Sequence, residues 1–219
     1  MLAVDGPSGS GKGTIGQILA SRLGWHFLDS GALYRLVGLA ARQQGIAVDD
    51  AAGLAQLARA MNIHFVPHQD GPPGVALEGQ DVSDILRTEE SGAAASQVAA
   101  LPEVRKALLH KQHALRRPPG LVADGRDMGT AVFPDALLKV FLTASAEVRA
   151  ERRYKQLKGK GFDVNLRQLL DEIRERDARD AAREASPLKP AADAHILDTS
   201  ALSISEVVDC IQGLLLQRR

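Results

Sequence analysis

A glycine-rich segment near the start of the sequence, Gly6-Pro7-Ser8-Gly9-Ser10-Gly11-Lys12, most constrains the fold. It follows a short apolar run, Leu2 to Asp5, and precedes helical apolar spacing over Ile15 to Leu23. A strand, a glycine-rich turn and a helix in this order match the pattern G-x-x-x-x-G-K, in which backbone N–H groups and the helix N-terminus bind phosphate. The lysine then reaches the β- and γ-phosphates. The segment therefore predicts a nucleoside triphosphate site made of Gly6, Pro7, Ser8, Gly9, Ser10, Gly11, Lys12, Gly13 and Thr14.

The residue after Lys12 is Gly13, so the hydroxyl that normally binds Mg²⁺ is displaced by one position to Thr14. Asp124 ends a buried apolar run, as does the acidic residue that holds Mg²⁺ or its water in many phosphate-loop enzymes. We therefore expect Asp124 to hold Mg²⁺ through water, with Thr14 as the second candidate ligand. The alternative is that Asp124 caps the turn at Gly125.

Strand and helix patterns alternate along the rest of the chain. Further strands are expected at 25–28, 121–124, 139–142 and 195–197, and helices at 31–41, 51–60, 89–115 with a break near Pro102, 146–157, 166–183 and 204–216. This alternation predicts an α/β fold with a doubly wound parallel sheet of the P-loop NTPase type and helices on both faces. Between 63 and 82 the apolar pattern alternates instead, which predicts a small antiparallel hairpin with its turn at 69–74.

Composition excludes several classes of protein. Lys plus Arg and Asp plus Glu each number 27, so there is no excess of positive charge to hold a long nucleic acid. No apolar run approaches the roughly 18 residues of a membrane span, and no basic leader precedes the first strand. The single cysteine, Cys210, excludes an internal disulfide and fits a reducing compartment, so we expect a cytoplasmic protein. Cys210 itself is predicted to be a small core residue.

Several segments together resemble the bacterial cytidylate kinase family. They are Gly9-Ser10-Gly11-Lys12-Gly13-Thr14, Leu28-Asp29-Ser30-Gly31-Ala32-Leu33-Tyr34-Arg35, Ala95-Ser96-Gln97-Val98-Ala99, Asp124-Gly125-Arg126-Asp127-Met128-Gly129-Thr130 and Arg176-Asp177-Ala178-Arg179-Asp180. The resemblance runs from Val4 to about Asp198, and includes an insertion over roughly 63–85 that other kinases of this group lack. It implies transfer of the γ-phosphoryl group of ATP to CMP or dCMP, with Mg²⁺.

The resemblance also implies how the chain is divided. Residues 1–219 would form one nucleoside monophosphate kinase domain. Its core would comprise about 1–35, 118–150 and 185–219, with a monophosphate-binding lobe at about 36–117 and a lid at about 151–184. The lobe would carry the antiparallel strands, and the segment from Tyr154 to Gly161, with a turn at Gly159-Lys160-Gly161, would be part of the moving lid.

Residue roles come partly from position and partly from the family. Arg126 follows a buried strand, at the carboxyl edge where α/β sheets bind ligands, and Arg35 lies near a helix start. The resemblance implies that Lys12, Arg126, Arg179 and Arg183 are catalytic. It implies that the acceptor nucleotide contacts Ser8, Ser30, Arg35, Ser96, Arg105, Arg126, Asp127, Arg176, Asp180 and Arg183. In this set Asp127 and Arg105, assisted by Ser96, would read the cytosine edge.

The helix predicted at 166–183 carries a charged continuation of its apolar stripe. Arg176, Asp180 and Arg183 are spaced by four and three residues, so Asp180 can hold the arginines or accept from ribose hydroxyls. The alternative is a solvated face with exposed ion pairs.

Other functions stay open at this point. The nearest rivals are kinases of the same architecture that act on UMP, AMP, dTMP or a small alcohol such as shikimate. A phosphate-loop switch or motor is disfavoured, because the chain lacks the Asn-Lys-x-Asp guanine signature and is too short for a motor's second lobe. We expect a monomer that binds small nucleotides, with no nucleic acid and no membrane as partner.

Overall fold

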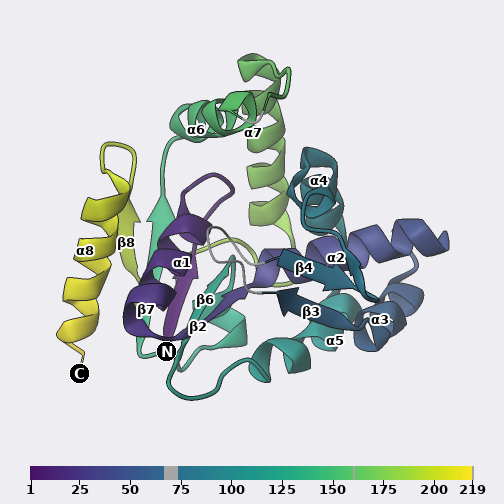
Figure 1. Ribbon diagram of the computed structural model, residues 1–219, viewed down its shortest axis with the longest axis horizontal. Helices are drawn as coiled ribbons and strands as arrows, with labels where there is room; N and C mark the ends of the chain where they lie inside the picture. Colours follow the sequence, from purple (N-terminus) through teal and green to yellow (C-terminus); the bar gives the residue numbers. More distant parts are fainter. Residues whose placement is uncertain (67–73, 160, 219) are drawn as a thin grey trace. The chain divides into compact units, whose positions relative to one another are not determined.

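The strand that precedes the glycine-rich loop lies at the centre of a five-stranded sheet with the order β2-β6-β1-β7-β8 (Figure 1). The strands are β1 (Leu2–Asp5), β2 (His26–Asp29), β6 (Leu121–Gly125), β7 (Leu138–Thr143) and β8 (His195–Asp198). The pairs β1–β6, β1–β7 and β7–β8 are parallel, which confirms the predicted parallel sheet. This computed structural model describes residues 1–66, 74–159 and 161–218.

Both faces of the sheet are covered. Every residue of β1 and β6 is buried, and successive strand residues point to opposite faces. On one face, α1 (Lys12–Leu23) and α8 (Ile204–Leu216) pack on the strands, side by side in Figure 1. Their shared core contains Leu2, Val4, Ile15, Leu19, Val122, Val140, Val208 and Ile211. On the other face lies a short π-helix over Met128–Val132, which the sequence patterns did not predict.

A buried carboxylate on β1 holds this π-helix in place. The oxygens of Asp5 accept hydrogen bonds from the backbone N–H groups of Met128 and Gly129, each at 2.8 Å. Burial raises the pKa of Asp5 to about 6, because the charged form loses its hydration. The two N–H donors and Arg126 act in the opposite direction, and nearby Asp127 adds to the increase. The end of β6 and the turn after it are thus fixed to the central strand.

The helix boundaries show why some expectations succeeded and others failed. α8 spans the predicted range and begins with a capping box between Ser203 and Glu206. α1 begins at Lys12 rather than Ile15, because Gly11 in a left-handed conformation ends the loop there.

Cys210 is exposed, so its assignment to the core was wrong. At about 100° per residue it lies well away from the stripe of Val207, Val208, Ile211 and Leu215 that α8 buries.

Residues 29–114 form a compact unit distinct from the one that contains residues 1–28 and 115–219. It contains α2 (Ser30–Gln44), α3 (Ala51–Ala60), α4 (Glu89–Val98), α5 (Pro102–His113) and a short 3-10 helix (Ile85–Arg87). Its antiparallel sheet has the order β3-β4-β5, with β3 (Ile63–Val66), β4 (Gly74–Leu77) and β5 (Gln80–Asp81). The predicted hairpin is therefore confirmed and gains the short strand β5. The predicted turn at 69–74 lies outside the described residues, except for Gly74.

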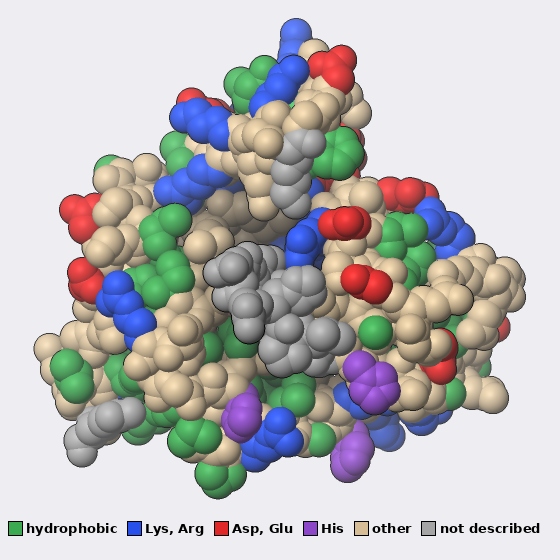
Figure 2. All heavy atoms as spheres, in the orientation of Figure 1, with side chains coloured by type: hydrophobic (Ala, Val, Ile, Leu, Met, Phe, Trp, Pro, Cys, Tyr) green, Lys and Arg blue, Asp and Glu red, His purple; other side chains and the backbone are tan. Residues whose placement is uncertain are grey.

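The other unit also contains α6 (Ala146–Gly159) and α7 (Leu166–Ala182), which pack against each other at the top of Figure 1. Lys and Arg side chains gather over α6 in Figure 2. The predicted turn at 159–161 includes residue 160, which lies outside the described residues. None of the helices in the described part of the chain is long and apolar enough to cross a membrane. The boundaries of core, lobe and lid stay a prediction.

We expect Asp5→Asn to change how stability depends on pH. The pKa of Asp5 rises from 3.8 to about 6 on folding, so between these values the folded chain binds more protons than the unfolded chain. This group therefore makes the free energy of unfolding fall as pH rises from about 4 to 6, by roughly 3 kcal/mol for a shift of this size. Urea titrations followed by Trp25 fluorescence at several pH values measure the difference. A difference between parent and variant that is independent of pH would contradict the expectation.

Candidate active site

The glycine-rich loop leaves β1 along a path that only glycine allows at its first position. Gly6 has φ +151°, and a Cβ atom there would lie 2.1 Å from the carbonyl oxygen of Leu142 on β7. At the far end Gly11 has φ +91° and is the N-cap of α1, where it offers no side chain to the first N–H groups of the helix. The loop and the helix N-terminus together can donate several N–H groups to one anion.

Lys12 begins α1 and bends back over this loop. Its Nζ donates to the carbonyl oxygen of Pro7 at 2.9 Å, and the residue is only 8% exposed. The ammonium group is therefore held above the backbone of the loop, beside the place where the motif puts the terminal phosphates of a nucleotide.

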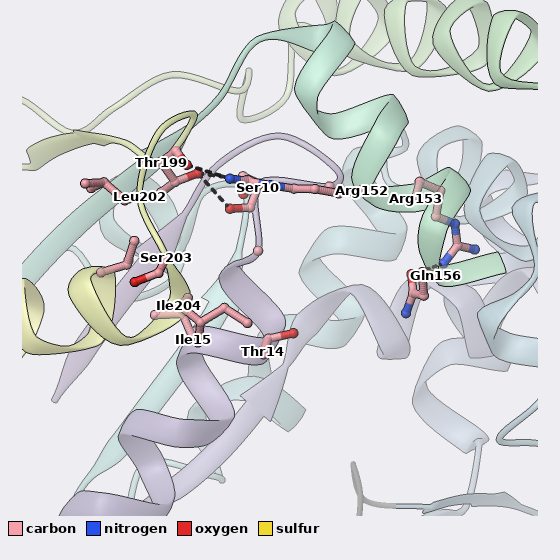
Figure 3. A pocket seen from close by; sticks show the side chains of 13 residues that line it. Ser10, Thr14, Ile15, Arg152, Arg153, Gln156, Thr199, Leu202, Ser203 and Ile204 are labelled. Carbon is pink, nitrogen blue, oxygen red and sulfur yellow. Dashed lines mark hydrogen bonds between the residues drawn. The ribbon is translucent and has the colours of Figure 1, made fainter. Parts of the chain in front are cut away.

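A pocket of about 490 Å³ opens beside the loop (Figure 3). Three segments of one unit line it: the loop with the start of α1, one face of α6, and the connection from β8 to α8. The lining residues are Gly9, Ser10, Gly11, Thr14, Ile15, Arg152, Arg153, Gln156, Thr199, Leu202, Ser203, Ile204 and Val207. Apolar walls with a few polar groups and two guanidinium planes suit a flat heterocycle joined to a polar tail.

Hydrogen bonds around Thr199 tie the walls of this pocket together (Figure 3). Arg152 on α6 donates from Nη1 to the hydroxyl of Thr199 at 3.0 Å and from Nη2 to its carbonyl oxygen at 2.5 Å. The Thr199 hydroxyl is in turn 3.3 Å from the carbonyl oxygen of Ser10, to which it donates. Neither Arg152 nor Thr199 was expected at the site from the sequence. The available signal was that Thr199 follows β8, at the carboxyl edge where such sheets bind ligands.

Asp124 and Thr14, the expected metal ligands, lie in different surroundings. Asp124 is buried at the end of β6, and a Cβ atom on Gly13 would lie 3.2 Å from its Oδ2. Gly13 therefore occupies the place beside the carboxylate, whereas Thr14 lines the pocket. In the ranges that the structure describes, no three His, Cys, Asp or Glu side chains form a metal-binding group. A single carboxylate beside the start of α1 fits Mg²⁺, which keeps several waters and takes its other ligands from phosphates.

Asp180 on α7 organises the arginines near the end of β6. It accepts from Nε of Arg126 at 3.0 Å and lies 4.0 Å from Nη1 of Arg183. Of the contacts expected from the spacing, the one between Asp180 and Arg183 is present, whereas the contact with Arg126 joins α7 to a residue far away in sequence. Asp180 is 3% exposed, so the alternative of a solvated, charged face does not describe this part of α7. The guanidinium groups are held in position before any anion binds, which is the condition for preorganised charge.

The remaining expected residues of this unit lie close by on the same elements. Asp127 is buried directly before the π-helix that Asp5 holds. On α7, Arg176 donates to the hydroxyl oxygen of Ser8 at 3.5 Å, and Arg179 is half-buried.

The expected residues of the other unit lie on three packed helices. Ser30 begins α2 and Ser96 lies on α4, and both are buried. Arg35 on α2 donates to the carbonyl oxygen of Leu86. Arg105 on α5 donates to the carbonyl oxygen of Ala99 at 3.2 Å, and its guanidinium carbon lies 5.7 Å from the centre of the Tyr34 ring. Arg105 is thus held against an aromatic ring and is not a freely solvated helix residue.

Comparison with known proteins gives a consistent assignment. A family model described as cytidylate kinase matches residues 2–216. A cytidylate kinase of Pseudomonas aeruginosa (strain UCBPP-PA14) is 60% identical over 213 residues, covering 96% of this chain and 93% of that protein. One of Pseudomonas putida (strain W619) is 57% identical over 219 residues, covering 100% and 96%.

Solved structures with a similar arrangement have much lower sequence identity. A gluconokinase from Sinorhizobium meliloti 1021 aligns with a TM-score of 0.49 at 19% identity, covering 99% of this chain and 91% of that one. A shikimate kinase from Acinetobacter baumannii aligns with a TM-score of 0.47 at 17% identity, covering 100% and 93%.

We expect Arg152→Ala to weaken binding of an ATP analogue with a non-hydrolysable β–γ bridge by about tenfold or more. The change removes hydrogen bonds from a charged group, each worth roughly 1.5–3 kcal/mol, and loosens the pocket wall at Thr199. Calorimetric titration measures the affinity. Arg116→Ala is the control, because Arg116 forms an exposed ion pair with Asp135. Equal affinities for Arg152→Ala and the control would contradict the expectation.

Proposed function

From the premise that this chain belongs to the cytidylate kinase family, we propose that it transfers the γ-phosphoryl group of ATP to CMP or dCMP, giving ADP and CDP or dCDP. The observation that carries this function is the identity of 60% across 96% of the chain with a cytidylate kinase, joined to a loop shaped for phosphate. Loop and family are independent supports, because the loop alone would fit any nucleotide-binding enzyme of this architecture.

The donor nucleotide occupies the loop and the adjacent pocket. Backbone N–H groups between Gly9 and Thr14 bind its phosphates, and Lys12 neutralises charge on the β- and γ-phosphates. The base and ribose of ATP lie between α6 and the connection after β8, where Arg152 and Leu202 line the pocket.

Magnesium belongs to the same proposal. Asp124 would hold the ion through water, and Thr14 is the second candidate ligand. The chemistry that Mg²⁺ would supply there is positive charge that offsets the charge developing on the phosphates during transfer.

The acceptor nucleotide is assigned its residues from the family resemblance. Arg126, Arg183 and Arg179 bind the acceptor phosphate or the transferring group, while Arg176 and Asp180 contact the ribose and Ser8, Ser30 and Arg35 complete the set. Phosphoryl transfer needs little covalent chemistry from the protein, so positioning and positive charge supply most of the rate. The support for this assignment is that Asp180 already orients two of the arginines.

The cytosine base is read by Asp127, Arg105 and Ser96. Cytosine presents an amino donor at N4 beside acceptors at N3 and O2, so its pocket needs one acceptor and at least one cation or donor. The buried carboxylate of Asp127 supplies the acceptor, and Arg105 with Ser96 supplies the donors. The enzyme works as a monomer in the cytoplasm, on small nucleotides, with neither nucleic acid nor membrane as partner.

A panel of acceptors tests the proposal. With saturating ATP, turnover in a coupled ADP assay should be high with CMP and dCMP and much lower with UMP, AMP, dTMP and shikimate. Equal or higher efficiency with AMP, UMP or dTMP would replace the proposal by a kinase of the same architecture with another monophosphate as substrate.

Asp127→Asn should lower kcat/KM for CMP and narrow the ratio of CMP to UMP efficiency. The carboxylate opposes O4 of UMP, whereas an amide can turn its NH₂ group toward O4. A site that reads a hydrogen-bonding edge can discriminate by about four powers of ten, so the change should be large. Asp135→Asn, an exposed acid of the following segment, is the control. A parental CMP to UMP ratio in Asp127→Asn would reassign base reading to Arg105 and Ser96.

Lys12→Ala should abolish phosphoryl transfer while CMP still binds. Removing the cation from the transferring group should reduce turnover by several powers of ten. Turnover and CMP affinity are measured on the same preparation, and turnover within a few-fold of the parent would remove Lys12 from the mechanism.

A further inference from the structure

Arg149 on α6 packs against the phosphate loop and is not among the residues expected to bind a nucleotide. The residue is 4% exposed, and its guanidinium group makes contacts in three directions. Nε donates to the carbonyl oxygen of Ala144 at 2.9 Å, and Nη1 donates to the carbonyl oxygen of Ser8 at 3.1 Å. Nη1 and Nη2 also donate to the two carboxylate oxygens of Asp177 on α7, at 3.2 and 2.6 Å. One buried side chain therefore contacts the phosphate loop and α7 together.

The phosphate loop meets Arg149 through its stem as well. A Cβ atom on Gly9 would lie 3.0 Å from Cβ of Arg149, so the loop packs closely on this side chain. The neighbour of Asp177 on α7, Arg176, reaches the same part of the loop through the hydroxyl of Ser8. The backbone at Ser8 and Gly9 is thus held by α6 directly and by α7 through Asp177 and Arg176.

A second ion pair between the same helices offers a comparison. Glu147 on α6 and Arg174 on α7 lie 2.7 Å apart, but their side chains are 60% and 56% exposed and Arg174 donates to a single carboxylate oxygen. Exposed pairs of this kind contribute little, whereas breaking a buried pair leaves an uncompensated charge. The planar fork of arginine matches a carboxylate in a way that lysine cannot. The lower exposure of its side chains, 5% for Arg149 and 27% for Asp177, and its two-point geometry distinguish the Arg149–Asp177 pair.

We propose that Arg149 and Asp177 are positioning residues for phosphoryl transfer. Their ion pair fixes the position of the phosphate loop relative to α7. The inference rests on the proposed function, because α7 carries Arg176, Arg179 and Asp180 and the loop leads into Lys12. Neither side chain of the pair is expected to contact a nucleotide. Their effect reaches the reaction through the loop backbone at Ser8 and through the residues adjacent to Asp177 on α7.

The test compares Arg149→Lys and Asp177→Asn with Glu147→Gln as the matched control. We expect kcat for CMP phosphorylation to fall about 10- to 100-fold in the first two variants, since a misplacement near 1 Å can cost this much. KM for CMP should change less than kcat. The rate of ATP hydrolysis without CMP should increase relative to the rate of transfer to CMP, because misaligned charged groups exclude water from the γ-phosphate less completely. Glu147→Gln should keep both activities within about twofold of the parent.

Two further variants separate positioning from simple stabilisation. The double variant R149K/D177N should be no slower than the slower single variant, because both changes break one interaction. Asp177→Glu keeps the charge and should recover part of the lost kcat. The inference would be overturned if Arg149→Lys and Asp177→Asn lowered the urea midpoint of unfolding but left kcat unchanged. It would also be overturned if Glu147→Gln lowered kcat as much as they do. If Arg149→Lys does not fold, Asp177→Asn and Asp177→Glu test the positioning role, which requires a higher kcat in Asp177→Glu than in Asp177→Asn.

The parent enzyme separates this inference from the proposed function. If the parent does not phosphorylate CMP, the proposed function fails. If the parent phosphorylates CMP and Asp177→Asn matches it in kcat and in the hydrolysis ratio, the function stands and the positioning role is wrong.

Discussion

The close approach of Gly6 to β7 is the constraint on which the rest of the site depends. Any side chain at Gly6 would collide with the carbonyl oxygen of Leu142, and only the resulting sharp exit from β1 brings the loop back over the end of the sheet. β1 is central, so the loop lies between the carboxyl ends of β6 and β7. The site residues of this unit then come from strand ends and the positions directly after them, with Asp124 at the end of β6, Arg126 directly after β6 and Thr199 directly after β8. A parallel sheet gathers these groups without requiring them to be close in sequence.

Three carboxylates hold the charged parts of this unit in place, of which Asp5 and Asp180 are buried and Asp177 is partly exposed. Asp5 binds the backbone after Asp127, Asp180 binds Arg126 and Arg183, and Asp177 binds Arg149. Burying such groups costs hydration, and the raised pKa of Asp5 is a direct sign of that cost. As a result, the arginines and turns are already oriented before the substrate binds, so less reorganisation is needed during phosphoryl transfer. The stability of the fold and the geometry of the reaction are therefore linked through the same few side chains.

Local pattern was sufficient for the parts of the fold that depend on neighbours in sequence. The glycine spacing identified the phosphate loop, period-3.6 apolar positions located α8, and the spacing of three residues predicted the contact between Asp180 and Arg183. Contacts between distant segments were not visible in this way. Thr199 and Arg149 contact the loop from segments far away in sequence, and the π-helix is held by Asp5, 123 residues before Met128. Cys210 lies on the same helix as an apolar stripe but on another face. Periodicity indicates a face of a helix but not the partner of that face.

The most direct test of the account follows the labelled γ-phosphate of ATP in a single turnover. With enzyme in excess over [γ-³²P]ATP and CMP present, the label should appear in CDP, with little in inorganic phosphate. Without CMP the label should remain in ATP over many times the half-life of the transfer reaction, since the transferring group is aligned for a phosphate acceptor rather than for water. Rapid release of labelled phosphate that does not depend on CMP would contradict the account, because it would identify an ATPase of this fold and not a nucleotide kinase.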